Sequence, residues 1–364
     1  MGTSQSLGNI AVPTRARLQP YAVLAAVVAA GIASYFWIDS RYPALLKKLH
    51  SGKAIHISGP LSFDALLPVT TQMPFLTRVA NTAVDWAYTN RIGMTFGVFF
   101  GAAAMTVLAT LPRRRFAGPY ANTALGAAIG APLGVCANCV APIGQGLVQG
   151  GASPATMLAA MIASPTLNVL VITMAFTLLP LPVAIARLAA PLVLLALVPL
   201  LTDSGAKQPL PAAMVCAIDL GPKRTWLQSL GLLARSYFRN FGRLALATVP
   251  WMLAAGLLGA LAAELVPAQR LPTEVNFFGI LLTALLGTFA PVPIAFDVAL
   301  AYLLLSRGVP APYVATLACT LGAFSIYPFV IVGRTLSWPV ALKVFAAVMV
   351  VGMVAGGVIA AVYR

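Results

Sequence analysis

Most of the chain consists of long apolar runs that are separated by short polar segments. Nine of these runs have the length and the apolar composition of membrane helices. They cover Tyr21–Ile38, Ile92–Leu111, Ala121–Gly151, Ser153–Leu179, Val183–Leu201, Leu244–Val266, Val275–Arg307, Ala311–Val332 and Val340–Val362. We therefore expect an all-α polytopic membrane protein with about seven to nine transmembrane helices.

Four of the nine runs contain a break rich in proline or in small and polar residues. The breaks read "GVCANCVAPIG" at 134–144, "ASPTLN" at 163–168, "FAPVPIAFD" at 289–297 and "LGAFSIYP" at 321–328. A proline inside a membrane helix frees a backbone carbonyl, and lipid offers no water to satisfy it. We expect these breaks to be buried in protein or to line a wet cavity.

The broken runs form two matched pairs, one in each half of the chain. The segment that starts at Gly150 aligns with the segment that starts at Arg307, and this alignment places Gly151 on Gly308. Broken helices in corresponding positions are typical of transporters with inverted repeats, so we expect two repeats, each with a re-entrant hairpin or a broken helix. The chain then divides into an N-terminal tail, first helix and outer loop at 1–91, a first repeat at 92–202, a basic loop at 203–243 and a second repeat at 244–364.

The distribution of basic residues predicts the orientation in the membrane. Lys and Arg number 23 against 8 Asp and Glu, and membrane proteins concentrate basic residues in cytoplasmic loops. Arg113–Arg115 marks the cytoplasmic end of the second run, which also places the N-terminus in the cytoplasm. If all nine runs crossed the membrane, the basic loop at 203–243 would lie outside. Re-entrant hairpins at 121–151 and 275–307 return that loop to the cytoplasm, and we favour them.

Residues 39–90 mix polar and amphipathic sequence. The stretch "MPFLTRVANTAVDWAY" at 73–88 has the composition of a helix that lies in the membrane interface. We therefore expect a periplasmic loop that carries one interfacial helix.

Composition excludes several classes of protein. Hydrophobic residues make up 60% of the chain and charged residues only 9%, where a soluble domain carries about 25%. Cytoplasmic loops account for the net charge of +15, and no aromatic–basic pattern indicates a nucleic acid partner. No phosphate-binding loop, Ser-His-Asp order or zinc-protease motif is visible, so we expect neither an enzyme nor a bound cofactor.

Cys136 and Cys139 lie in the first break and share one face if that stretch is helical. Thiolates bind soft partners such as Cu(I), Zn(II), trivalent arsenic or antimony, or another thiol. The pair is therefore a candidate site for a soft metal or metalloid as substrate. Alternatively, cysteine serves as a small packing residue, which is the better interpretation for the isolated Cys319.

Other polar and proline residues at the breaks are candidates for contact with a substrate. Polar groups at membrane depth either bind a solute or join helices, and the second role can account for Ser164 and Thr166. Asp297 is the only acidic residue deep in a predicted apolar run, which favours proton or ion coupling unless it pairs with Arg307 or with backbone. The candidate substrate-binding residues are Cys136, Asn138, Cys139, Pro142, Gln145, Ser164, Pro165, Thr166, Asn168, Pro291, Pro293, Ser325 and Tyr327.

Two stretches resemble the signatures of a known family. "GAPLGVCANCVAPIGQGLVQGGASPATMLAAMIASPTLNVLVI" is similar to the first signature of the bacterial predicted-permease family that includes the organoarsenical efflux permeases. "APVPIAFDVALAYLLLSRGVPAPYVATLACTLGAFSIYPFVIV" resembles the looser second signature, and the likeness covers most of 92–362. Many members carry a Cys-Ser-Cys core, whereas this chain has a Cys-x-Asn-Cys core, so the arsenical substrate does not transfer. The resemblance implies permease activity, with matching positions at Cys136, Cys139, Pro142, Ser164, Pro165 and Asn168.

Three functions are compatible with the sequence. The first is a permease of the bacterial inner membrane that moves a small solute or ion, with efflux of a soft metal, metalloid or organoarsenical species as the best fit. Its partners are the lipid bilayer and the solute, and a homo-oligomer stays open as its assembly. The second is a thiol–disulfide conduit that uses Cys136 and Cys139. The third is a non-transporting membrane subunit of a larger complex.

Overall fold

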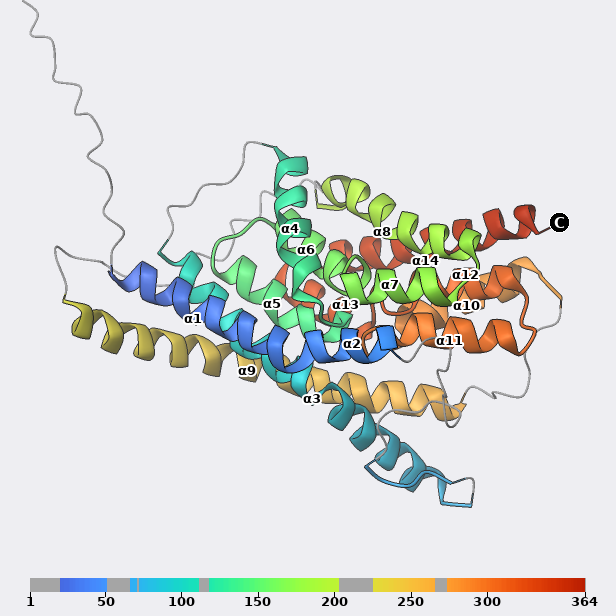
Figure 1. Cartoon of the computed structure of the whole chain (residues 1–364), viewed down its shortest axis with the longest axis horizontal. Helices are drawn as coiled ribbons and strands as arrows, with labels where there is room; N and C mark the ends of the chain where they lie inside the picture. The colour runs from blue at the N-terminus through green and yellow to red at the C-terminus, as the bar shows by residue number, and fades with distance from the viewer. Residues whose placement is uncertain are drawn as a thin grey trace, which may run out of the picture.

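The computed structural model describes residues 20–50, 66–70, 72–110, 118–202, 225–265 and 274–363, and nearly all of them are helical (Figure 1). The helices are α1 (Pro20–Phe36), the π-helix η1 (Trp37–Arg41), α2 (Tyr42–His50), α3 (Phe75–Leu108), α4 (Pro119–Leu133), α5 (Ala137–Gln149), α6 (Pro154–Thr166), α7 (Val169–Leu178), α8 (Leu181–Thr202), α9 (Trp226–Leu265), α10 (Phe277–Phe289), α11 (Phe296–Ser306), α12 (Ala311–Thr320), α13 (Ile326–Thr335) and α14 (Trp338–Val362).

Five of the described helices are long and apolar enough to cross a membrane, which fits a membrane protein. They are Pro20–Leu46, Phe75–Leu108, Leu181–Thr202, Trp226–Glu264 and Trp338–Val362. The bent pair α6–α7, with a 42° angle at its break, makes a sixth if it counts as one span. This number is below the seven to nine expected, because the four broken runs are each divided into helices of 10 to 15 residues.

Each of the four breaks expected from the sequence coincides with a gap between two short helices. The gaps lie at 134–136, 167–168, 290–295 and 321–325. Proline, glycine and the capping residues Cys136 and Asn168 stand at these positions, and each of these residue types ends or restarts a helix for a local reason. The breaks are therefore properties of the local sequence.

Two predicted loops are partly helical. The interfacial helix expected at 73–88 is not separate from the second run, because α3 continues from Phe75 to Leu108 over 34 residues. No proline or glycine interrupts it before Gly93, so nothing in that stretch breaks the helix. The helix expected at Leu244–Val266 likewise begins earlier, since α9 starts at Trp226. Arg113–Arg115, Arg15 and Arg17 lie outside the described residues.

Helices α3 and α9 pack against each other in antiparallel orientation and run along the long axis of the molecule (Figure 1). An ion pair of Arg78 with Glu264 at 2.8 Å and a hydrogen bond from Asn240 to Thr106 at 3.0 Å connect the two helices and show their antiparallel order. Tyr21 of α1 lies 2.6 Å from Ser236 of α9, so α1 completes a three-helix group.

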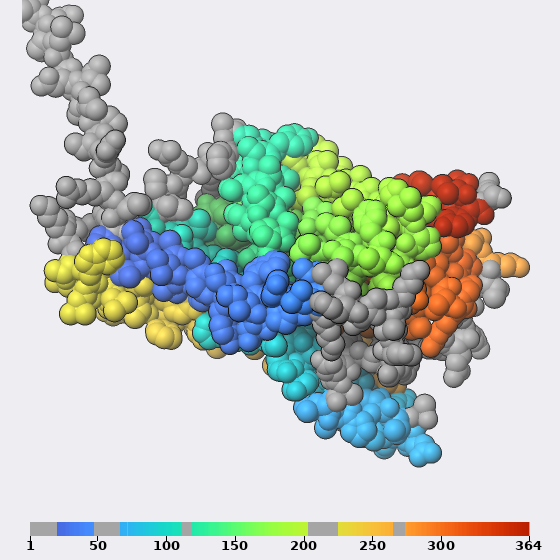
Figure 2. Space-filling view, viewed as in Figure 1, coloured from blue at the N-terminus to red at the C-terminus, as the bar shows by residue number. Residues whose placement is uncertain are grey.

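Helices α5 and α6 form the centre of the core. Every residue from Ala137 to Val148 in α5 and from Ala155 to Thr166 in α6 is buried. Small residues allow close approach: a side chain at Gly97 of α3 would overlap the Cys139 carbonyl, and the Cβ position of Gly101 lies 2.9 Å from the Pro142 carbonyl. In Figure 2, the α1–α2 segment (blue) lies across the middle of the face that is shown.

Candidate functional site

Both cysteines of the Cys-x-x-Cys pair lie in the core, at the first break. Gly134 takes a left-handed conformation (φ 58°) that turns the chain between α4 and α5. Cys136 then caps α5, because its Sγ accepts a hydrogen bond from the Cys139 N–H at 3.3 Å. Its thiol also donates to Asn90 Oδ1 at 3.7 Å. Both cysteines are buried free thiols.

Asn138 connects the first break to the two breaks of the second half. Its side chain is fully buried, with an exposed fraction of 0%. Its Oδ1 accepts a hydrogen bond of 2.7 Å from the hydroxyl of Ser325, the last residue of the gap before α13. Its Nδ2 donates to the Val292 carbonyl at 3.4 Å, inside the gap between α10 and α11. One amide therefore joins three separate chain breaks.

Ser164 connects the first break to the second break, which lies in the bent pair α6–α7. Its hydroxyl lies 3.2 Å from the Val135 N–H and 3.3 Å from the Val135 carbonyl, and it bonds both. Both backbone groups belong to Val135, which lies in the gap between α4 and α5. The serine therefore satisfies polar groups that lipid could not. All four breaks thus converge on one buried polar cluster, which we call the break junction: Cys136, Asn138, Cys139, Ser164, Val292 and Ser325.

Helix α3 closes one side of the break junction. Trp86 donates from Nε1 to the Pro291 carbonyl at 2.8 Å, and Asn90 donates from Nδ2 to the Trp86 carbonyl at 2.8 Å. Asn90 therefore presents its Oδ1 to Cys136. The Pro291 carbonyl, which lies in the gap between α10 and α11, thus receives a hydrogen bond from Trp86. This is what we expect for a broken helix that is buried in protein.

The π-helix η1 covers the first break. Trp37 donates from Nε1 to the Pro132 carbonyl at 2.7 Å, and the stem of Arg41 packs over Gly134. The Cβ position of Gly93 lies 2.7 Å from Cys139 Sγ and 3.8 Å from Arg41 Nη2, so the thiol and the guanidinium face each other. A π-turn inside a helix is frequent at functional sites, and here it places an arginine beside two thiols.

Two buried polar atoms on facing helices have no hydrogen-bond partner in the described part of the chain. Tyr327 is 1% exposed and belongs to the same buried cluster as Cys136 and Cys139; its hydroxyl has Thr248 as a polar neighbour but makes no hydrogen bond of normal length. Gln145 is on the same face of α5 as Asn138, seven residues later, and its Oε1 is unpaired. Unpaired buried groups are rare, and these belong to predicted site residues.

Several predicted site residues have roles within their own helices. Thr166 bonds the Ile162 carbonyl one turn back, which is the helix-joining or backbone role considered from the sequence. Asn168 caps α7 by accepting from Val171 N–H at 3.0 Å and donates to the Ser164 carbonyl at 2.7 Å. Three prolines have no side-chain polar group and shape the backbone: Pro142 and Pro165 lie within α5 and α6, and Pro293 lies in the third gap.

Asp297 is buried and forms an ion pair that the sequence did not suggest. Arg187 of α8 donates to Asp297 Oδ2 from Nε at 2.9 Å and from Nη2 at 2.6 Å. The partner is therefore Arg187, and neither Arg307 nor backbone alone. Arg187 is 2% exposed, so it does not extend to the membrane interface as a residue near a span end would. The pair ties α8 to the start of α11, where Asp297 also lies against Gly322 in the fourth gap.

The described residues contain no group of three or more His, Cys, Asp or Glu side chains that could hold a metal ion. Cys136 and Cys139 can therefore supply two soft ligands and no third of these types. Two-ligand binding suits a soft ion or a thiol-reactive solute in passage more than a resident structural metal, which takes four ligands.

Sequence reasoning missed Arg41, Trp86 and Asn90, because residues 39–90 were interpreted as an outer loop. One signal was available for the last two. They are spaced by four residues in a stretch without proline or glycine, so a continuous helix places them on one face.

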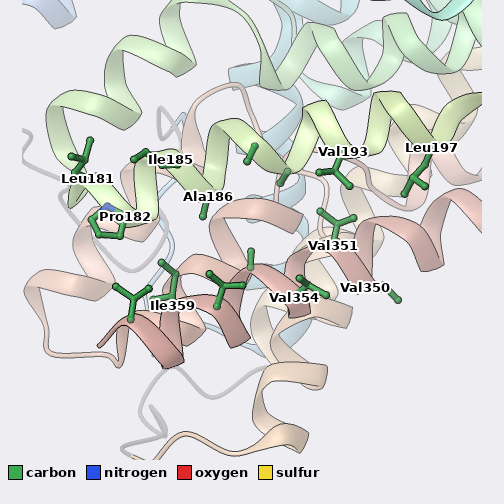
Figure 3. A pocket seen from close by; sticks show the side chains of 15 residues that line it. Leu181, Pro182, Ile185, Ala186, Val193, Leu197, Val350, Val351, Val354 and Ile359 are labelled. Atoms are coloured by element: carbon green, nitrogen blue, oxygen red, sulfur yellow. The ribbon is translucent and has the colours of Figure 1, made fainter. Parts of the chain in front are cut away.

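An apolar groove on the described surface is separate from the break junction. It lies between α8 and α14, has a volume of about 670 Å³ and is lined only by apolar and small residues such as Ile185, Val193 and Val354 (Figure 3). Such a surface suits lipid and offers no chemistry to a polar solute. In contrast, a smaller cavity of about 220 Å³ is lined by Trp86, Pro291 and Val292, on the edge of the break junction.

Comparison with known proteins gives no match: no protein-family model, no curated protein and no solved structure is similar to this chain. The fold and the site fit a general class: a helical membrane protein with a buried polar junction at four helix breaks.

Proposed function

We propose that this protein is a permease of the bacterial inner membrane that binds a small solute at the break junction. The observation that carries the proposal is the bonding of Asn138, which joins α5 to the gaps before α11 and α13. Helix breaks at membrane depth are costly unless they line a site, and here four of them converge.

The electrostatics of the break junction favour a solute with polar or negative groups. Helices α5 and α13 both begin at the junction, with Cys136 and Ser325 as their N-cap residues. A helix N-terminus presents unpaired N–H groups and the positive end of the helix dipole. Transporters use such half-helix ends to hold substrate.

Two antiparallel pairs support the inverted repeat that we propose. The first long helices of the halves, α3 and α9, are antiparallel, as the Arg78–Glu264 and Thr106–Asn240 contacts require. The last helices, α8 and α14, are also antiparallel, since the groove brings the start of α8 to the end of α14 (Figure 3). In this arrangement α4–α5 and α10–α11 are the re-entrant hairpins, and each half contributes three spans.

Backbone geometry agrees with that correspondence. Gly134 precedes α5 and Ala295 precedes α11, and both have positive φ, at 58° and 62°. Gly151 and Gly308 follow α5 and α11, and both are again positive, at 103° and 79°. The likeness to the family of the organoarsenical efflux permeases runs over the same elements, and we propose membership of that family on this basis.

The side chains suggest a division of roles. Cys136 and Cys139 contact a soft atom of the solute, whereas Asn138 and Ser325 hold both hairpins in place or orient a polar group. Asp297, neutralised by Arg187, takes part in coupling to a proton or ion. Because all of these side chains are buried, the structure corresponds to a closed state, and the solute enters by separation of helices.

The proposal is tested by solute accumulation in a deletion strain that is complemented with defined variants. The screen covers arsenicals, soft metals and sulfur or selenium anions, and the full-length chain restores the normal level of the true solute. The double variant C136S/C139S is expected to lose this effect, and C319S is the matched control, because Cys319 is an equally buried cysteine outside the break junction. Normal transport by C136S/C139S rejects a thiol role, and no effect of the intact gene on any solute rejects the permease.

One observation favours a second function, the thiol–disulfide conduit: the two free thiols belong to one turn of the chain, where the Cys139 N–H donates to Cys136 Sγ at 3.3 Å. A conduit also needs a second thiol pair, and the described second half offers only Cys319, which packs against Ala190 and Ala355. Trapping a mixed disulfide between Cys136 or Cys139 and a thioredoxin-like protein supports the conduit. If neither transport nor trapping is found, a non-transporting subunit is left as the interpretation.

A further inference from the structure

Arg41 carries a positive charge inside the first candidate span, Pro20–Leu46. Its Nε is buried without a partner, and Arg41 makes neither a hydrogen bond nor an ion pair with any described residue. Its one ring contact places the guanidinium 4.6 Å from the centre of the Phe36 ring. Arg41 is half-buried, and a charge that is partly removed from water is stabilised by a negative group nearby.

No carboxylate supplies that negative group in the described part of the chain. Asp39, two residues earlier, is exposed and lines an outer groove with Arg91. Asp297 is engaged by Arg187. The groups that face Arg41 are the thiols of Cys136 and Cys139, which leaves two choices: a thiolate or an anionic ligand.

The neighbouring groups favour an anionic ligand. Tyr327 is 1% exposed and belongs to the same buried cluster as both cysteines; its hydroxyl has Thr248 as a polar neighbour but makes no hydrogen bond of normal length, so it can donate to a ligand. Helix α5 has 13 residues and directs its N-terminus into the same place, where the dipole favours negative charge. Arg41, Tyr327 and the start of α5 therefore form a set of donors, and only the two sulfur atoms are soft.

We propose that the break junction selects a small anion with a soft sulfur or selenium atom, the class to which thiosulfate belongs. Arg41 and Tyr327 hold the anionic oxygens, and Cys136 and Cys139 contact the soft atom. This inference rests on the proposed function and narrows its substrate class. Arg41 becomes the residue that determines specificity for charge.

The test measures binding of three probes to the purified full-length chain in lipid nanodiscs. Thiosulfate has two negative charges and a soft sulfur, sulfate has the same charge without the soft atom, and phenylarsine oxide is a neutral reagent for thiols. We expect thiosulfate to bind at least about tenfold more tightly than sulfate, equivalent to ~1.4 kcal/mol. R41Q should lose about tenfold or more in thiosulfate affinity, R41K should retain part of it, and Y327F should weaken it less than R41Q does.

The control variant is R91Q, because Arg91 is exposed on the outer groove and bonds only the Tyr88 carbonyl and ring. It should bind thiosulfate as the unaltered chain does. Sulfate binding equal to thiosulfate binding overturns the role of the soft atom. Unchanged thiosulfate binding in R41Q, or no thiosulfate binding at all, overturns the anion proposal. If R41Q instead weakens phenylarsine oxide alone, Arg41 serves a thiolate, and the permease proposal stands without the anion.

Discussion

The Ser325 hydroxyl donates a 2.7 Å hydrogen bond to Oδ1 of Asn138, and the two residues are 187 positions apart in the chain. Both are buried, at 1% and 0% exposure. Each stands at the start of a short helix, α13 and α5, so the bond connects the two halves at their breaks. A solute that binds here would contact both halves, which is the arrangement that alternating access requires.

The Asn138–Ser325 bond predicts measurable coupling between the two halves. N138A leaves the Ser325 hydroxyl and the Val292 carbonyl without their partner, which costs about 1–3 kcal/mol for buried groups. S325A should cost less, because Asn138 keeps its bond to Val292. A double-mutant cycle on thermal unfolding in detergent should give a coupling energy of roughly 0.6–1.7 kcal/mol.

Transport by the same variants separates structure from function. N138A should reduce transport about tenfold or more, beyond the effect of its lower stability, and S325A should reduce it less. T177A is a suitable control, since Thr177 bonds only backbone carbonyls of its own helix. Additive effects of N138A and S325A would contradict the proposed contact.

The Arg187–Asp297 ion pair predicts a charge-balance effect on folding. Removing one partner leaves the other charge buried at 2–3% side-chain exposure, which should cost about 3–5 kcal/mol and reduce expression. The double variant R187Q/D297N has no buried charge and should recover expression. If Asp297 couples transport to protons, this folded double variant should move solute only down its gradient, as measured in proteoliposomes with and without a pH difference.

The half-buried pair of Arg78 and Glu264 is the control for that experiment. Its side chains are 25% and 18% exposed, and ion pairs near solvent contribute roughly 0–1 kcal/mol. E264Q should therefore express and transport as the unaltered chain does. Equal losses in E264Q and D297N would contradict the assignment of a special role to the buried pair.

The helix breaks could be predicted from the sequence because their causes are local. Gly134 with its positive φ and the Pro291–Pro293 stretch lie in the gaps themselves, and Asn168 caps a helix through its own side chain. Pro142 and Pro165, in contrast, lie inside α5 and α6, which continue through them. The position of Cys136 and Asn138 in one break could be predicted from the same local sequence.

The contacts between the breaks could not be predicted in this way. Arg187 and Asp297 are 110 residues apart, and no periodicity reports that two distant charges meet. Arg41 was missed for a different reason: polar sequence after Ile38 resembles a loop, whereas the chain stays helical through η1 and α2, with Trp37 and Arg41 of η1 packed over Gly134. The pairing partner of a buried polar group is set by the tertiary fold, and hydropathy contains no information about it.

Close packing of α3 against α5 predicts a sharp difference between two glycines. A methyl group at Gly97 would overlap the backbone carbonyl of Cys139, which cannot move aside as a flexible side chain could. G97A should therefore destabilise the protein by about 1–3 kcal/mol and shift the thiols from Arg41. G242A, in α9, meets nothing within 4 Å and should be neutral or stabilising by up to ~1 kcal/mol. Thermal unfolding and transport of both variants check this, and equal behaviour would contradict the packing.

The hairpin topology predicts the side of the membrane on which Cys216 lies. Cys216 belongs to the basic loop at 203–243 and is outside the described residues, whereas Cys136, Cys139 and Cys319 are buried. If α4–α5 and α10–α11 are re-entrant, this loop is cytoplasmic, as its Lys and Arg content favours. A membrane-impermeant maleimide should then leave intact cells unlabelled and label inside-out vesicles. C216S should abolish the signal, and labelling of intact cells would mean that both hairpins cross the membrane.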